Sequence, residues 1–363
     1  MDRIYASGAA GSAPSVPASP SSGYPTAGNP GTGTPATKPG PYWYHMVMEE
    51  LMAIITAGGI APAPGALNQV KLALDALYMS KTASLGNGSN DFRLTLTSGA
   101  PVTTTNVTNA GTLYLTPYKG NRIALYDGSA NWNSRTSAEM SIAVPATTNT
   151  MYDVFCYDNA GVPTLELLAW TNDTTRTTAL SYQNGVLVKS GASTRRYIGS
   201  FRTGAVSGKT EDSLSNRLVW NYCNRVLRQA RGTFSADRAT ASTTYVELNS
   251  EIRIGFVVGV SEDPIFAAAN GSVSGDANRW AGTAFAFDGT AADASLEGGA
   301  LAGGAIGASG IRCGVNLIGY KVGIAAGYHY ATIIGKTDAG TSTWQSATST
   351  TGAKFYATLG IQG

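Results

Sequence analysis

Short alternating runs separated by turn residues dominate the chain from about residue 90 to residue 363. Apolar and polar residues alternate in GTLYLTPY, NRIALYDG and TMYDVFCYDNAG, and again in TTYVEL, TAFAFDG and YHYATIIGK. A period of two is that of a strand with one buried face. In LSYQNGVLV, Asn184-Gly185 is the residue pair that a two-residue hairpin turn requires. Repeated short strands with such turns predict a mainly β fold, of the sandwich or barrel type.

Composition narrows the classes of partner. Charged residues make up 13% of the 363 residues, and the formal net charge is +2. A chain with so few clustered cations is not expected to bind the nucleic-acid backbone. The three cysteines, Cys156, Cys223 and Cys313, lie far apart and form no CxxC pair. We therefore expect reduced thiols, no metal site and no cofactor.

Residues 1–41 form the first segment, which holds eight of the 15 prolines together with many glycines and serines. Such a segment buries too little apolar surface to fold alone. It is either a flexible linker or an extended arm that becomes ordered along a partner. Bulky apolar residues stand at its start, in MDRIY, so Met1, Ile4 and Tyr5 are the expected anchor of such an arm. The start of the chain contains no apolar core of a signal peptide, so none is expected.

Residues 42–88 are expected to form two short helices, a helical neck. Apolar residues recur at steps of three and four on both sides of a GGIAPAPG break. These residues are Tyr44, Met48, Leu51 and Ile55 before the break, and Leu67, Val70, Leu74 and Leu77 after it. A narrow apolar stripe on a short helix is stabilised only by packing onto a partner. The glycines and prolines also interrupt the apolar run well short of a membrane span, so no membrane insertion is expected.

The remaining chain is predicted to hold two β-domains, residues 89–232 and residues 233–363, each sandwich-like. The polar stretch from Ser207 to Gly232 is interpreted as a strand that leads from one domain to the next. The glycine-rich segment from Gly298 to Gly310 is interpreted as a flexible loop.

Motifs that carry chemistry are few, and each has a plainer interpretation. GAVSGKT, from Gly204 to Thr210, lacks the spacing of a phosphate-binding loop and is better explained as a polar hairpin or loop. The only histidines, His45 and His329, are more consistent with packing or hydrogen bonding than with catalysis. The acidic candidates for glycan cleavage or Ca²⁺ binding all lie in turn-like sequence; they are Glu211, Asp212, Glu262, Asp263, Asp288, Asp293 and Glu297. No catalytic residue is therefore assigned.

Aromatic residues near the C-terminal end indicate a different chemistry. Tyr320, Tyr328, Tyr330 and Trp344 lie among small polar residues. Exposed aromatic rings stack on the apolar faces of sugars while polar neighbours bind the hydroxyls. The alternative is that part of this set belongs to the core of the sandwich. Both interpretations stay open at the level of the sequence.

The stretch PYWYHMVMEELMAIITAGGIAPAPGALNQVKLALDAL resembles the N-terminal region of bacteriophage fibre proteins. GTLYLTPYKGNRIALYDGSANW, MYDVFCYDNAG, LELLAWTNDTTRTTAL and NGVLVKSGASTRRYIGSFRT are similar to a β-module of phage virion proteins. The resemblance covers roughly residues 40–225. It implies a homotrimeric tail fibre or spike that binds the virion through its N-terminal part and the bacterial surface through its distal β-domains.

The sequence thus predicts a non-enzymatic structural protein, a homotrimer assembled in the cytoplasm of the host bacterium and located on the virion. Its expected partners are copies of itself, other virion proteins of the tail, portal or capsid, and a host surface glycan or receptor. A capsid-attached head fibre or decoration protein and a polysaccharide depolymerase tailspike are the alternatives. A free bacterial adhesin ranks after them, because it requires the secretion signal that is not expected here.

Overall fold

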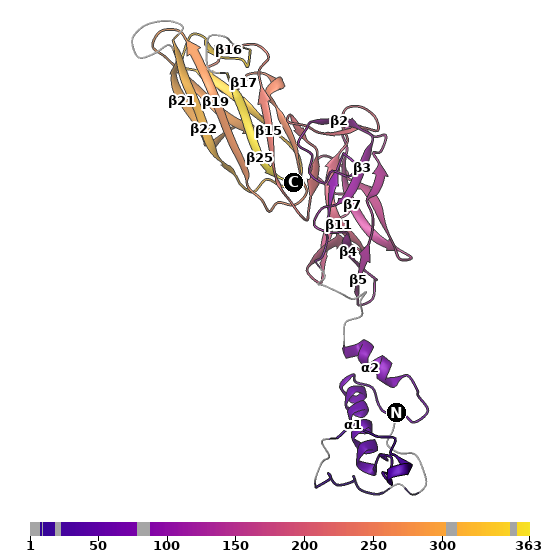
Figure 1. Ribbon diagram of the computed structural model, residues 1–363. Coiled ribbons are helices and arrows are strands. Elements are labelled where there is room, and N and C mark those ends of the chain that lie inside the picture. The colour runs from indigo at the N-terminus through magenta and orange to yellow at the C-terminus, as the bar shows by residue number, and fades with distance from the viewer. Residues whose placement is uncertain (1–7, 9, 19–22, 78–87, 303–310, 349–353) are drawn as a thin grey trace. The chain divides into compact units, whose positions relative to one another are not determined.

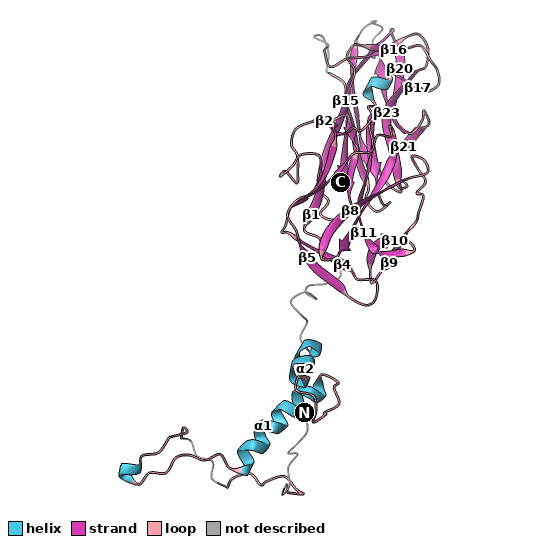
Figure 2. Ribbon diagram, turned by 90° about the vertical axis from the view of Figure 1, so that its right-hand side faces the viewer, coloured by secondary structure: helices cyan, strands magenta, loops and turns pink. Residues whose placement is uncertain are grey.

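The computed structural model describes residues 8, 10–18, 23–77, 88–302, 311–348 and 354–363. The chain divides into two compact units, Met1–Ser84 and Leu85–Gly363, which are called here the helical unit and the β unit. Strands predominate in the described residues, and the predicted mainly β class is confirmed. The two units are drawn in Figure 1 and Figure 2.

The helical unit contains the two predicted helices. They are α1 (Pro41–Ala57) and α2 (Gln69–Leu77), preceded by the short 3₁₀ helix η1 (Pro30–Thr32). Pro41 occupies the first turn of α1, where its missing N–H costs nothing. Gly58 follows the helix and packs so closely on Ala73 of α2 that a Cβ at Gly58 would overlap it. Gln69, the first residue of α2, binds the segment between the two helices. Its side chain donates to Ala61 O (2.8 Å) and accepts from Ala63 N (3.1 Å).

Two sheets of the β unit are built mainly from strands early in its sequence and are called here the first sheets. A three-stranded sheet has the order β1-β3-β6, and a six-stranded sheet has the order β8-β7-β11-β10-β9 with β14 on β11. Their bounds are β1 Phe92–Thr95, β3 Thr112–Pro117, β6 Met140–Ala143, β7 Met151–Asn159, β8 Val162–Ala169, β9 Leu180–Gln183, β10 Val186–Lys189, β11 Ala192–Arg202 and β14 Val219–Asn221. The strands β4 (Arg122–Tyr126) and β5 (Trp132–Thr136) pair separately. The hairpin predicted at Asn184-Gly185 is confirmed, with φ of 50° and 83° between β9 and β10.

An eight-stranded sheet and a second six-stranded sheet form the rest of the β unit. The eight-stranded sheet has the order β2-β12-β13-β18-β23-β20-β21 with β17 on β23, and the six-stranded sheet has the order β15-β25-β19-β24-β16 with β22 on β19. The bounds in the first are β2 Val107–Ala110, β12 Thr210–Asp212, β13 Asn216–Arg217, β17 Val246–Glu247, β18 Ile254–Val258, β20 Arg279–Phe287, β21 Ala292–Ala302 and β23 Gly327–Thr337. Those in the second are β15 Leu227–Thr233, β16 Arg238–Thr240, β19 Ile265–Gly275, β22 Arg312–Lys321, β24 Ser342–Trp344 and β25 Tyr356–Gln362; η2 (Ser250–Ile252) is a 3₁₀ turn.

The eight-stranded sheet and the second six-stranded sheet pack as a sandwich. Its core lies between them. Phe256, Phe285 and Ile333 of the eight-stranded sheet share one buried cluster with Trp344 and Leu359 of the six-stranded sheet. A separate cluster fills the space between the first sheets, around Phe92, Leu115 and Phe201. Alternate residues of each strand supply these cores, which is the pattern that the sequence predicted.

Two interpretations of local sequence were wrong. Gly298 to Ala302 belong to β21 and pair in register with β20. The backbone hydrogen bonds of this pairing need no side chain, so a glycine-rich run can form them. The rest of that predicted loop, residues 303–310, lies outside the described residues. The stretch from Ser207 to Gly232 is not one connecting strand, since it contains β12, β13, β14 and most of β15. Turns break it, among them the one at Asn224, where φ is 55°.

Candidate functional site

The pair α1 and α2 leaves much apolar surface exposed. Of the apolar residues on these two helices, Ile55 of α1 and Ala73 of α2 are fully buried. Trp43, Tyr44 and Met46 of α1 keep close to half of their surface in solvent, as do Leu72 and Leu77 of α2. Exposed bulky apolar side chains gathered on a helix are a candidate surface for docking of a partner.

The residues predicted at the trimer interface differ in exposure. Met48, Leu51 and Val70 are half-buried, whereas Tyr44, Leu74 and Leu77 are exposed on the helices. Ile55 is covered by the unit itself. Leu67 is 99% exposed and precedes α2, which begins only at Gln69. The predicted anchor residues Met1, Ile4 and Tyr5 lie outside the described residues.

The four predicted glycan-binding aromatics do not form one group. Trp344 is fully buried in the sandwich core, and its Nε1 donates to Thr283 Oγ1 at 2.8 Å. It is therefore unavailable for stacking on a ligand, and the alternative of a core residue holds for this position. Tyr328 lies under the guanidinium of Arg202, 3.9 Å from the ring centroid, and Tyr330 lies 4.4 Å under that of Arg253. Tyr320, on β22, is 63% exposed.

His329 occupies a hydrogen-bonding position, as predicted. His329 is buried on β23, with Nδ1 2.7 Å from Asp288 Oδ2 and Nε2 2.9 Å from Ala325 O. Burial raises the pKa of Asp288, but the hydrogen bonds from His329 and from Tyr330 N outweigh it, so that pKa is lowered overall. His45 Nδ1 lies 3.9 Å from Glu49 Oε1, one turn along α1.

The acidic candidates with described side chains form ion pairs with basic side chains or accept hydrogen bonds from hydroxyl groups. Arg225 contacts both Glu262 and Asp263, and Lys321 binds Asp293 at 2.7 Å. Asp212 contacts Arg217 at 2.8 Å and Arg228 at 2.9 Å, while Glu211 accepts from Ser213 Oγ. Carboxylates with such partners serve as structural ion pairs. Among the described residues, no group of three or more His, Cys, Asp or Glu side chains is placed to hold a metal ion.

GAVSGKT forms the loop that connects β11 to β12, which belong to different sheets. Gly204 N donates to Lys209 O (2.7 Å) and Lys209 N donates to Val206 O (3.1 Å). Thr210 Oγ1 donates to Arg202 O (2.6 Å). These donors are thus engaged by backbone oxygens of the chain, in agreement with a polar loop.

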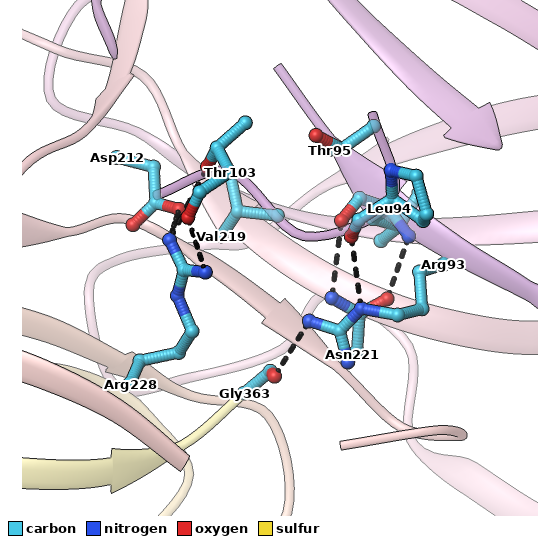
Figure 3. A pocket seen from close by; sticks show the side chains of 10 residues that line it. Arg93, Leu94, Thr95, Thr103, Asp212, Val219, Asn221, Arg228 and Gly363 are labelled. Atoms are coloured by element: carbon cyan, nitrogen blue, oxygen red, sulfur yellow. Dashed lines mark hydrogen bonds and ion pairs between the residues drawn. The ribbon is translucent and has the colours of Figure 1, made fainter. Parts of the chain in front are cut away.

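A small cavity between β1, β14 and β15 is lined by Arg93, Asn221 and Arg228, with Asp212 beside them (Figure 3). Its volume is about 10 Å³, which holds about one water molecule. The guanidinium of Arg93 donates to the carbonyl oxygens of Pro101, Asn224 and Gly363. Burial and the neighbouring Arg228 lower the pKa of Arg93 to about 10. The cavity is a structural joint, too small for an organic ligand.

A second joint links the first sheets to the sandwich. Asp153 of β7 is buried and accepts from Arg176 Nε (2.8 Å) and Ser200 Oγ (2.7 Å). Arg176 Nη2 also donates to Gly259 O (2.5 Å), just beyond β18. Burial raises the pKa of Asp153, while the cation of Arg176 opposes that rise. Neither joint was expected from the sequence, because their partners are separated by up to 270 positions.

Comparison with known proteins gives one sequence relative. No family model matches the chain. "Uncharacterized protein StfP" of Escherichia coli (strain K12) is 38% identical over 66 residues, which are 18% of this chain and 32% of that protein. The chain thus spans about a third of the length of the curated relative that it matches. Its printed name assigns no activity.

Solved structures give low similarities. A structure of infectious bursal disease virus, Gx strain, covers 78% of this chain and 74% of its own, at 9% identity and a TM-score of 0.27. The insecticidal delta-endotoxin Cry8Ea1 of Bacillus thuringiensis covers 74% and 51%, at 6% identity and a TM-score of 0.24. TM-scores this low carry no argument about fold or function.

The described helices also bear on the membrane question. None of those in the described ranges combines the length and the apolar character that a bilayer crossing requires.

Proposed function

We propose that this chain is a non-enzymatic structural protein of a tailed bacteriophage, a homotrimeric tail fibre or spike. The observation that carries the proposal is the exposed apolar surface of the helical unit. Tyr44, Leu74 and Leu77, which fall on the predicted stripes, stay between 39% and 50% exposed. Two short helices with this surface gain stability when copies of the chain cover it.

The charge of the helices favours copies of the same chain as that partner. In α1 the charged residues are Glu49 and Glu50, and in α2 they are Lys71 and Asp75. Lys71 already pairs with Asp75 one turn away. The exposed apolar side chains therefore meet few fixed charges that copies would have to bury.

The other roles follow the resemblance of residues 40–225 to fibre proteins. Residues 1–41, anchored at Met1, Ile4 and Tyr5, attach the trimer to another virion protein. The distal β-domain meets a glycan or protein receptor of the host, with Tyr320 as the most exposed of the proposed aromatic contacts. The protein acts on the virion without a cofactor, and neither nucleic acid nor a membrane is a partner.

The oligomeric state is tested by the mass of the full chain in solution. Light scattering after size exclusion at micromolar concentration is expected to give three times the mass of one chain, which is 37.5 kDa. A stable monomer under these conditions would contradict the trimer. The expected dependence on the helices is tested with the variants described in the Discussion.

Attachment is tested by deletion of residues 1–41. The shortened chain is expected to remain a folded oligomer but to be absent from purified virions, whereas the full chain is retained on them. Retention of the shortened chain would place the attachment surface elsewhere. A control variant with Tyr182→Ser, in an exposed position of β9, should attach as the full chain does.

A further inference from the structure

The six-stranded sheet of the sandwich presents an apolar outer face. Val315 and Leu317 of β22 are buried in the core, so Ile318 and Tyr320 are among the side chains that point to the opposite side. Ile318, Tyr320 and Val322 are 73%, 63% and 69% exposed. In Figure 1, β22, β19 and β25 lie at the front of the domain, and no labelled element passes over them.

The apolar surface extends from β22 across β19 to Leu227 of β15, while Thr358, Gln362 and Gln229 are polar positions on the same side of the sheet. Tyr320 pairs with Phe266 of β19, and their rings meet edge to face at 5.5 Å. Phe266 pairs with Gly360 of β25. A Cβ at Gly360 would lie 3.3 Å from Leu227 Cδ1 and 3.4 Å from Phe266 Cβ, so these two side chains meet above the glycine. Leu227, at the start of β15, is 67% exposed. The outer sheet face is defined here by Ile318, Tyr320, Val322, Phe266, Ala268 and Leu227.

Fixed charge is sparse on this side of the sheet, where Arg312 is exposed on β22 six positions before Ile318. Lys321 points to the other side, where it binds Asp293 at 2.7 Å. Arg231 of β15 stands on the same side of the sheet, but its guanidinium lies 5.1 Å from the ring centroid of Tyr356, away from Leu227. A partner that covers the outer sheet face therefore buries apolar area without having to desolvate a charge.

The chemistry around Tyr320 favours a protein partner over a sugar. Its neighbours on the face are Phe266, Ile318 and Val322, which offer no side-chain hydrogen-bond donor or acceptor. A sugar stacked on Tyr320 would leave its hydroxyl groups without partners on this side, at a cost in free energy. A second apolar sheet face loses nothing in the same position.

The area of the outer sheet face is that of a secondary interface, one that adds to association through the helices. Four strands about 4.8 Å apart, with outward positions about 6.8 Å apart in three rows, span about 400 Å². A standard interface buries about 800 Å² on each partner. The face alone is thus too small for a stable complex but contributes substantially if the helices associate as well. We propose that the outer sheet face packs against the same domain of neighbouring copies in the oligomer. This inference rests on the proposed oligomer.

Footprinting of the unmodified full chain tests the proposal. Hydroxyl-radical labelling followed by mass spectrometry is carried out on the oligomer, whose mass is measured in the same sample. Ile318, Tyr320 and Leu227 are expected to be labelled at least fivefold less than their exposure in one chain implies. Val162 and Tyr182, 63% and 67% exposed in the first sheets, provide the reference.

A matched pair of variants gives the energetic test. Ile318→Lys with Val322→Lys is expected to raise the dissociation constant of the full chain at least tenfold, because each copy would bring two cations into the interface. Val162→Lys with Tyr182→Lys adds the same charge elsewhere and should leave the dissociation constant unchanged. The melting temperature of each variant establishes that the sandwich is folded.

The outcomes distinguish failure of the proposed trimer from failure of the proposed packing of the outer sheet face. An oligomer in which the outer sheet face is labelled as freely as Val162 overturns this inference and leaves the trimer intact. A monomeric mass overturns the trimer, and with it this inference. Free labelling in the oligomer that falls when host surface polysaccharide is added assigns the face to glycan binding and also overturns the proposal. Protection in the oligomer together with the tenfold effect supports it.

Discussion

In the helical unit, Tyr44, Leu74 and Leu77 keep between 39% and 50% of their surface in solvent, whereas Trp344 and Phe256 of the β unit keep none. The same contrast holds for ion pairs. Lys71 and Asp75 of α2 are 75% and 58% exposed, while Asp153 of the β unit is 1% exposed beside Arg176. The β unit is stabilised by its own interior, and the helical unit has apolar surface still to bury. Substitutions matched between the units test this difference.

The largest expected effect belongs to Trp344→Ala. Removal of a fully buried indole from the sandwich core is expected to lower the free energy of unfolding by about 4 kcal/mol, measured by urea denaturation. The control is Trp43→Ala on α1, where half of the side chain is already exposed. Trp43→Ala should leave the unfolding of the β unit unchanged. Equal losses in both variants would remove the contrast between the units.

The buried ion pair comes next. Asp153→Ala leaves the guanidinium of Arg176 without its carboxylate partner in a buried joint, and we expect a loss of about 3 kcal/mol. Asp75→Ala removes the corresponding partner of an exposed pair and should change stability by less than about 0.5 kcal/mol. Thermal melts of both variants at one pH measure the difference. A small effect of Asp153→Ala would mean that the joint adds little to folding.

Polar substitutions on α2 should act on association instead. Leu74→Ser with Leu77→Ser removes apolar surface that copies are proposed to cover, at about 1 kcal/mol for each half-exposed leucine. Sedimentation at a series of concentrations is expected to show dissociation, with the melting temperature of the β unit unchanged. An unaltered oligomer would show that α2 is not part of the interface.

The smallest expected effect concerns pH. The pKa of Asp288 is lowered in the folded chain, so its stabilising contribution is present above the unfolded pKa and is lost as the pH falls through the folded pKa. Asp288→Asn should therefore make stability fall less steeply between about pH 5 and pH 3. The difference should stay below about 1 kcal/mol because nearly half of this side chain is exposed. A steeper fall in the variant would contradict the direction of the shift.

Much of the local structure was predictable from the sequence, because the determining residues are neighbours. The helix that ends at Gly58 and the Asn184-Gly185 turn depend on contacts a few positions apart. Strand alternation likewise predicted a strand at YHYATIIGK, where β23 lies. It could not establish which outer positions the fold covers, because that depends on other strands.

The candidate sites were less predictable for the same reason. Tyr320 and Trp344 share the same sequence context, yet the first is exposed and the second is enclosed by two sheets. The joint at Arg93 and the outer sheet face each combine strands more than 100 positions apart. The signal that was available lies in the second half of IRCGVNLIGYKVG, where Ile318, Tyr320 and Val322 occupy outer positions that a solvated strand would give to polar residues.

The buried arginines have a practical consequence for proteolysis. Arg93, Arg196 and Arg217 are each at most 9% exposed, and the guanidinium of Arg196 donates to Ser89 O and Ala124 O. Trypsin has to accept the arginine side chain in its own pocket, so these sites are closed to it while the β unit is folded. Lys38, by contrast, stands exposed in irregular structure, where cleavage is easiest. Peptides that end at Arg93, Arg196 or Arg217 therefore record unfolding of the β unit, whereas cleavage at Lys38 records only contact with the protease.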